Sequence, residues 1–524
     1  MEVSAPQRRH RFPFRRPSSV GPLLVALAVS LPAHALDVCV DTQEKLGQVF
    51  SDCGETDCTW RIPAGGGFAG NYRYTLDLPA TGTYRMIGGY NADCSARSPG
   101  SRTDLGRIEL SEARGSGRQS ITLEGLIVSD LSVTGRANPT TLTDLRIGRL
   151  AVDTNGAYPN GSNEPGAPIA ITDSVISGPV SVRSTWKGAI ALTRNVFDAG
   201  GVRLEVSGPP RRVRDVDNTL RNGFVPPGAT GAAGLTLDFG NTDVTATIRR
   251  NRFEDNWSWE SGGALGGITG SGSVDVDTNV FLGNGAWGTG GGVDLTVNGG
   301  RLRLLHNLFQ QNVAATGDYG GGAATIRLTD DDAALLVANN VLRGNVADVF
   351  DAGTEPVGQD LAVIADEDGN GTDAAITVRA NAIGTAQDSV LLVASDPAAG
   401  DNLAGPPLAL PDNPTPDAAG LDPLTYALPR RSALIDAGRP IDDWDNRFAL
   451  GGLPRRLGPA PDIGPSEAPP LALMPIGPEF GDAGWDHLAF GCRDVRSGVP
   501  GGCSLTAVDS VNGTATPISP DLIR

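Results

Sequence analysis

The stretch that decides the fold reads Asn251-Arg-Phe253-Glu-Asp-Asn256, and three related phrases follow it along the chain. The later copies are Asn279-Val-Phe281-Leu-Gly-Asn284, Asn307-Leu-Phe309-Gln-Gln-Asn312 and Asn340-Val-Leu342-Arg-Gly-Asn345. The first three copies start 28 residues apart, and the fourth starts 33 residues later. A repeat of this length is too short for two helices, and its wealth of Gly, Asn, Val and Thr is typical of coils of parallel β-strand. The sequence therefore predicts an all-β solenoid.

Outside these phrases, short segments alternate apolar and polar residues, as in Ile121 to Val128 and Ile169 to Ile176. Alternate residues of such strands point into the coil, where each side chain stacks on its counterpart about 4.8 Å away. A recurrent Asn at a bend can bond to the Asn of the coils above and below. The Asn-x-Phe residues are therefore expected to be core and turn residues and not ligands.

The chain has 524 residues, 70 of them Gly and 38 Pro, with 40% apolar residues and a formal net charge of −18. Repeats propagate one continuous core, so we expect a single long body with caps at its ends. The expected divisions are a signal peptide over residues 1–35, an N-terminal cap with the first coils over 36–104, the coils over 105–400, a C-terminal cap over 401–467 and a tail over 468–524. The excess of acidic residues disfavours nucleic acid as a partner, and we expect a monomer.

The N-terminus has the pattern of an export signal. Five arginines precede an apolar run from Val20 to Leu31, and Ala33-His34-Ala35 forms a small-x-small cleavage site. No later stretch is long and apolar enough for a membrane segment. We therefore expect an exported protein at the cell surface, in the periplasm or outside the cell, and a short helix from Asp41 to Phe50 that caps the first coil.

The exported part contains six cysteines, an even number that suits an oxidising compartment. Cys53 with Cys58 and Cys492 with Cys503 are the close pairs, which leaves Cys39 to meet Cys94. The four N-terminal cysteines allow three connectivities, and spacing alone does not choose among them.

A family resemblance is carried by the C-terminal region. Ser432 to Gly438, Gly452 to Arg455 and Asp462 to Glu467 follow in order the pattern S-P-A-I-D-A-G, D-x-x-G-x-P-R and D-I-G-A-x-E. In these respects the chain resembles bacterial exported right-handed parallel β-helix proteins, including those grouped as choice-of-anchor Q proteins. The resemblance implies a pectate-lyase-like right-handed β-helix with a C-terminal cap, and it implies no particular activity.

Aromatic residues recur between the Asn phrase and the following Gly-Gly step, where a ladder along one edge of the solenoid is expected. Flat aromatic faces spaced along a groove suit stacking on sugar rings, and neighbouring carboxylates can accept hydroxyl hydrogen bonds. The candidate glycan-binding residues are Trp257, Trp259, Trp287, Tyr319, Asp255, Glu260 and Asp318. The alternative is that these rings fold over the coil edge and shield it.

One acidic loop resembles a calcium-binding loop. Asp366, Asp368 and Asn370 stand at its first, third and fifth positions with Gly371 at the sixth, and Asp373 follows. The closing Glu is missing because Thr377 occupies its position. The alternatives are a Ca²⁺ site and a solvated loop.

Function is expected to be non-catalytic binding of polysaccharide or of a surface at the cell exterior. The mature chain keeps only His306 and His487, so a nucleophile-histidine site is improbable. A carbohydrate-active enzyme, either a polysaccharide lyase or a glycoside hydrolase, is the competing class, although no motif identifies catalytic residues. A structural surface protein is the third class.

Overall fold

The structure is a computed structural model. It describes residues 36–53, 57–65, 68, 73–78, 82–112, 119–134, 139–154, 168–185, 188–207, 211–315, 321–347, 360–365, 374–379, 381–383, 390–393, 408–409, 428, 432, 434–441, 448–450, 453–457, 460–468, 487–492, 503–509 and 514–518.

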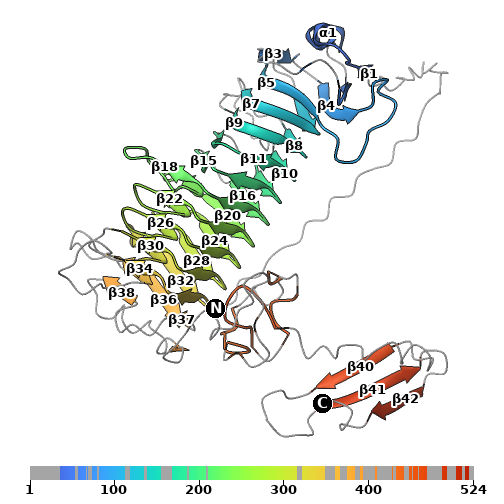
Figure 1. The fold of residues 1–524 in the computed structure, drawn as a ribbon. Coiled ribbons are helices and arrows are strands. Elements are labelled where there is room, and N and C mark those ends of the chain that lie inside the picture. Colours follow the sequence, from blue (N-terminus) through green and yellow to red (C-terminus); the bar gives the residue numbers. More distant parts are fainter. Residues whose placement is uncertain are drawn as a thin grey trace, which may run out of the picture.

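Parallel β-strands form a long stack, as Figure 1 shows, which confirms the predicted all-β solenoid. One sheet has 13 strands in coil order. Its strands are β1 (Leu36–Cys39), β2 (Cys58–Pro63), β4 (Gly82–Tyr90), β6 (Gln119–Glu124), β8 (Thr140–Thr143), β10 (Ile169–Thr172), β13 (Ile190–Thr193), β16 (Arg211–Val216), β20 (Val244–Arg249), β24 (Ser273–Asp277), β28 (Arg301–Leu305), β32 (Ala334–Ala338) and β36 (Ala375–Arg379). The handedness of the coils and the division boundaries stay predictions.

The second sheet begins with β3 (Arg73–Leu78) and the long strands β5 (Thr103–Glu112), β7 (Leu126–Thr134) and β9 (Arg146–Thr154). β9 then pairs with two shorter strands, so the sheet continues as two ladders. The first ladder contains β11 (Val175–Ile176), β14 (Val196–Asp198), β17 (Thr219–Arg221), β21 (Arg252–Glu254), β25 (Val280–Leu282), β29 (Leu308–Gln310), β33 (Val341–Arg343), β37 (Ala382–Ile383) and β39 (Leu408–Ala409). The second contains β12 (Val180–Ser184), β15 (Val202–Val206), β19 (Leu235–Asp238), β23 (Leu265–Ile268), β27 (Val293–Val297), β31 (Ala324–Leu328), β35 (Leu361–Ile364) and β38 (Val390–Val393).

A third parallel sheet appears only in the later coils, where the turn before the second ladder is longer. Its strands are β18 (Phe224–Val225), β22 (Trp257–Ser258), β26 (Gly285–Ala286), β30 (Val313–Ala314) and β34 (Val346–Ala347). Near the C-terminus, β40 (His487–Cys492), β41 (Cys503–Asp509) and β42 (Thr514–Ile518) form a separate antiparallel sheet.

The recurrent phrases form columns inside the stack, as predicted. Phe253, Phe281 and Phe309 are buried, with ring centroids 4.8 and 4.6 Å apart and rings within 4° of parallel. The Asn residues form two ladders. In the second ladder, Nδ2 of Asn256 donates to Oδ1 of Asn284 at 2.8 Å, and Asn284 Nδ2 donates to Asn312 at 2.9 Å. Because the backbone N–H of each Asn donates to the same oxygen of the next coil, each amide satisfies buried groups of two coils.

The N-terminal helix α1 (Gln43–Cys53) lies at the β1 end of the stack, and its role as a cap stays a prediction. Thr42 Oγ1 accepts a hydrogen bond from the backbone N–H of Lys45 at 3.3 Å, which is an N-cap interaction. Leu46 packs into the main core at 1% exposure. The expected disulfides are present as Cys39–Cys94 and Cys53–Cys58. In the antiparallel sheet Cys492 lies opposite Cys503, and a bond between them stays a prediction.

The C-terminal motif folds back over the first ladder of the second sheet. Leu434 and Ile463 cover an apolar stripe on the outside of the coils that includes Val280, Leu308 and Val341. Arg455 is 1% exposed and joins this segment to the coils. Its guanidinium donates to Thr278 Oγ1 at 2.6 Å and to the carbonyls of Gly464 and Pro465 at 2.9 and 3.1 Å.

Candidate functional site

The predicted tryptophans lie on the third sheet and on the turns that follow it. Trp259 and Trp287 occupy equivalent places in adjacent coils, and each is 37% exposed. Their ring centroids are 5.0 Å apart with 24° between the planes. This separation matches the coil spacing, so the two rings stack along the solenoid axis. Both rings keep exposed surface, and the two interpretations, stacking on sugar rings and shielding of the coil edge, stay predictions.

Trp257 leans across the next coil. A Cβ atom at Gly285 would lie 2.3 Å from two of its ring carbons, so the indole occupies the space that a side chain at 285 would take. Phe224 lies in the preceding coil, opposite Trp257 in the strand register, and its side chain is 55% exposed. Sequence reasoning missed Phe224 because its coil lacks the full Asn phrase. We call Phe224, Trp257, Trp259 and Trp287 the aromatic edge.

The predicted acidic neighbours are only partly placed. Asp255 and Glu260 are both exposed beside the aromatic edge. Asp318 and Tyr319 lie outside the described residues, as do the calcium candidates Asp366, Asp368, Asn370 and Asp373. Within the described part of the chain, no group of three or more His, Cys, Asp or Glu side chains is placed to hold a metal ion. Calcium binding therefore stays a prediction.

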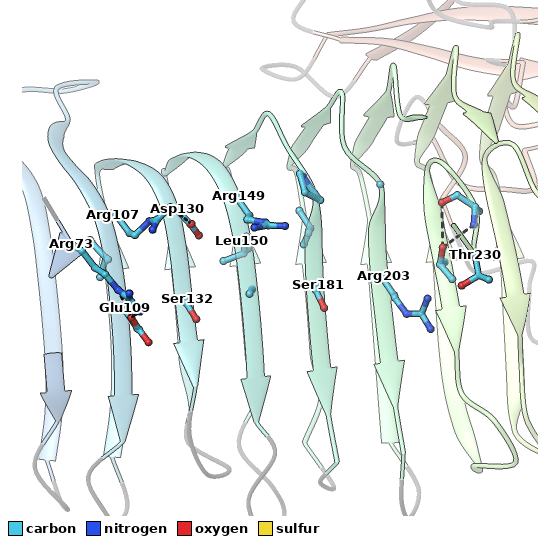
Figure 2. Close-up of a pocket in the computed structure, with 17 residues that line it drawn as sticks. Arg73, Arg107, Glu109, Asp130, Ser132, Arg149, Leu150, Ser181, Arg203 and Thr230 are labelled. Atoms are coloured by element: carbon cyan, nitrogen blue, oxygen red, sulfur yellow. Dashed lines mark hydrogen bonds and ion pairs between the residues drawn. The ribbon is translucent and has the colours of Figure 1, made fainter. Parts of the chain in front are cut away.

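A second candidate site was not expected from the sequence. A groove of about 590 Å³ runs along the outer face of the second sheet, from β3 across β5, β7, β9, β12 and β15 to β19. Figure 2 shows its polar side chains rising from neighbouring strands. With strands about 4.8 Å apart, the lining covers about 29 Å along the stack. We call this site the arginine groove, and its charged lining residues are Arg73, Arg107, Arg149, Arg203, Glu109 and Asp130.

Strand register explains how these side chains come together. Arg73 lies beside Arg107, Arg107 beside Asp130, and Asp130 beside Arg149, so one outward column crosses four strands. The next outward column contains Ser132, Ser181 and Arg203. Both columns face solvent because strand side chains alternate between core and surface.

Glycines at the corner before these columns let the turns stack closely. A Cβ at Gly148 would lie 2.3 Å from the Ser129 carbonyl oxygen, and one at Gly178 would lie 2.1 Å from that of Gly148. A side chain at either position would collide with the backbone of the neighbouring coil.

Most of the charged side chains in the groove are paired. Arg73 pairs with Glu109, Arg107 with Asp130 at 3.0 Å, and Arg203 with Asp238 at 2.6 Å. Arg149 is exposed and has no ion pair or hydrogen bond with another described residue. It is therefore the cation of the groove that is most available to a ligand.

The groove ends where the longer turns begin. Thr230 and Ala232, from the turn between β18 and β19, form its last wall. Ser258 Oγ of the next coil donates to the Gly231 carbonyl at 3.2 Å, which ties the groove end to the strand that carries Trp257. The arginine groove and the aromatic edge therefore meet at one turn.

One buried carboxyl outside the groove has a perturbed pKa. Burial raises the pKa of Asp294, although its oxygens accept hydrogen bonds from Arg327 at 2.7 Å and from Thr289 at 2.5 Å. The carboxyl is 7% exposed and does not line the groove. Its geometry fits a structural cross-link between the adjacent coils of β27 and β31 and not an acid that reaches a substrate.

No protein-family model matches this chain, and no curated protein is a detectable relative. Among the described residues, no helix is long and apolar enough to cross a bilayer.

Proposed function

We propose that the chain is an exported β-solenoid that binds polysaccharide at the cell exterior without cleaving it. The observation that carries the proposal is the arginine groove, an elongated trough lined by charged and apolar residues that meets the aromatic edge at the Gly231 turn. A trough of this volume lies in the usual range for ligand sites. Its length across many strands suits a polymer better than a compact metabolite.

The proposal that binding is non-catalytic is supported by the ion pairs that the groove carboxylates make. Glu109 and Asp130 are each paired with an arginine of the same sheet. Hydrolysis of a glycosidic bond commonly needs two carboxyl groups free to act as acid and base or nucleophile. No histidine lines the groove.

The test is a panel of soluble polysaccharides presented to the full exported chain in affinity electrophoresis and calorimetry, with product analysis in parallel. The proposal expects saturable binding and unchanged polymer length. The double variant W259A/W287A should weaken binding, while the matched change of the buried ring, Phe281→Leu, should leave affinity unchanged in the folded protein. Shortened products, or an unsaturated product that absorbs in the ultraviolet, would favour the enzyme alternative instead.

We also propose that the chain is similar to the choice-of-anchor Q proteins. The support is that the motif segments around Ser432, Arg455 and Glu467 belong to one structural unit. Glu467 accepts hydrogen bonds from the backbone N–H groups of Leu457 and Asp462, each at 3.2 Å. N-terminal sequencing of the secreted protein tests the export part of the proposal and should give Leu36 as the first residue.

A further inference from the structure

We infer that the arginine groove selects polysaccharides that carry anionic groups, with Arg149 as the residue that determines this specificity. The inference rests on the proposed polysaccharide binding and names the chemical class of the ligand. It draws on the charge of the groove, the environment of Arg149 and the spacing of the arginines.

The net charge of the groove has the opposite sign to the net charge of the whole chain. The protein carries a formal charge of −18. The lining residues include four arginines and two acidic residues, a local excess of two positive charges before the Arg203 partner Asp238 is counted. A positive trough on a negative protein attracts an anionic polymer to that trough and repels it from the rest of the surface.

Arg149 is placed to make the specific contact. It projects from β9 near the middle of the groove, and Figure 2 shows it between the Asp130 and Ser181 side chains. Because no described residue pairs with it, a carboxylate or sulfate can accept two hydrogen bonds from its guanidinium without breaking an existing ion pair. The hydroxyls of Ser132 and Ser181 also line the groove and can bond to sugar hydroxyls.

The spacing of the arginines favours a polymer over a single anion. Arg107 on β5 and Arg149 on β9 lie in one column, with β7 between them. Arg203 lies on β15, and β12 is the one strand between β9 and β15. Two strand steps are about 10 Å, so a cation recurs at about this interval along the trough. The flanking arginines already have acidic partners, which leaves most of the discrimination to Arg149.

The experiment compares three probes at low and high salt: alginate, dextran sulfate and uncharged dextran. The variant is Arg149→Gln. Arg146→Gln is the matched control because Arg146 is exposed on the same strand and does not line the groove. Both substitutions remove one surface charge, so melting temperature should stay unchanged in each.

We expect tighter binding of at least one anionic probe than of dextran. Arg149→Gln should weaken that binding by about 10- to 100-fold, the range for a lost charge-assisted hydrogen-bonded pair, and Arg146→Gln should change it by less than about twofold. Whether alginate or dextran sulfate responds to Arg149→Gln identifies the anion as carboxylate or sulfate.

Two results would overturn the inference and leave the proposed function intact. One is Trp-dependent binding of dextran with no preference for either anionic probe. The other is an equal loss in the Arg149 and Arg146 variants, which would show only non-specific attraction. If no polysaccharide of any charge binds, the proposed function itself fails.

Discussion

A carboxylic acid buried among apolar side chains makes a sharp test of the packing. Asp215 lies on β16 and points into the core, between Leu192 and Ile248 of the adjacent coils. Asn218 Nδ2 donates to its Oδ1 at 2.6 Å, and Oδ2 has no hydrogen-bond partner among the described residues. Burial raises the pKa of Asp215 from 3.8 to about 7. We predict that Asp215→Leu stabilises the protein above neutral pH.

The magnitude follows from this pKa. In the unfolded chain the carboxyl loses its proton near its ordinary pKa, whereas the folded protein holds the proton to about pH 7. The free energy of unfolding therefore falls as pH rises through that window, by about 4 kcal/mol in total at about 1.4 kcal/mol per pH unit. Leu removes this penalty. Asn218 still has acceptors for both Nδ2 hydrogens, the Leu192 carbonyl at 2.9 Å and Asn251 Oδ1 at 3.3 Å.

The assay is thermal melting of wild type and variant at matched pH from about 4 to 8. For a chain of 524 residues that melts as one unit, unfolding entropy is about 1 kcal/mol per degree, so about 4 kcal/mol corresponds to about 4 °C at pH 8. The larger Leu side chain can cost about 1–3 kcal/mol through overpacking. The isosteric variant Asp215→Asn avoids that cost and serves as the control.

The difference in melting temperature between variant and wild type isolates the effect of Asp215. Glu467, whose pKa is raised by burial to about 8, titrates in both proteins and cancels. The difference in melting temperature should grow with pH for both substitutions. If it stays flat from about pH 4 to pH 8 in both, the carboxyl is not buried as described and the reasoning about this column is wrong.

Three further predictions concern other parts of the stack. Asn284→Ala removes the acceptor of the Asn256 backbone and side-chain N–H groups, so it should cost about 2–4 kcal/mol of unfolding free energy in denaturant titration, and an unchanged midpoint would refute the ladder's role. Replacing Cys39 and Cys94 by Ala removes a disulfide with a sequence separation of 55, and the chain-entropy model gives such a cross-link about 4 kcal/mol of stabilisation. This loss should lower the melting temperature more than loss of the shorter Cys53–Cys58 disulfide does. Arg455→Met should leave the coils folded but speed proteolysis within residues 432–468, since the segment loses its buried hydrogen bond to Thr278; equal proteolysis rates would contradict this.

The interior of the solenoid could be predicted from the sequence because each coil repeats the same inward residues. Phe253, Phe281 and Phe309 stack as expected, and so do the Asn ladders. The Cys39–Cys94 bond resolves a choice that spacing left open, since β1 lies beside β2 and β2 beside β4, just before Cys94.

The arginine groove could not be predicted in the same way. Arg107, Arg149 and Arg203 lie in separate repeats. The coils of Arg107 and Arg149 lack the Asn phrase that marks register, and the coil of Arg203 has only its first half, Asn195-Val-Phe197. Their alignment depends on which residues oppose each other across β5, β7, β9, β12 and β15. A one-residue slip would turn each of these side chains toward the core.

The burial of His306 could not be predicted from the sequence, for a different reason. It occupies a turn position with a positive φ of 54°, as its place before Asn307 suggests, yet it is only 1% exposed. Burial and the nearby Arg455 guanidinium lower its pKa well below the ordinary value. That environment is created by the C-terminal segment, which lies more than a hundred residues away in sequence. A local pattern cannot report such a contact.

The positions of the arginine groove and the aromatic edge follow from where the coils stop being alike. Up to β15 the turn into the second ladder is short, and the outer face of the long strands stays open as a trough. The five coils from β18 to β34 each add a strand of the third sheet and a longer turn; this turn closes the trough, and the tryptophans lie on these coils. A polymer seated on Arg149 and directed toward the C-terminal coils would therefore meet the Gly231 turn first and the aromatic edge next. The length of the oligosaccharide should then separate the two contacts. The affinity for an oligosaccharide shorter than the trough should fall in Arg149→Gln but should not change on loss of Trp287.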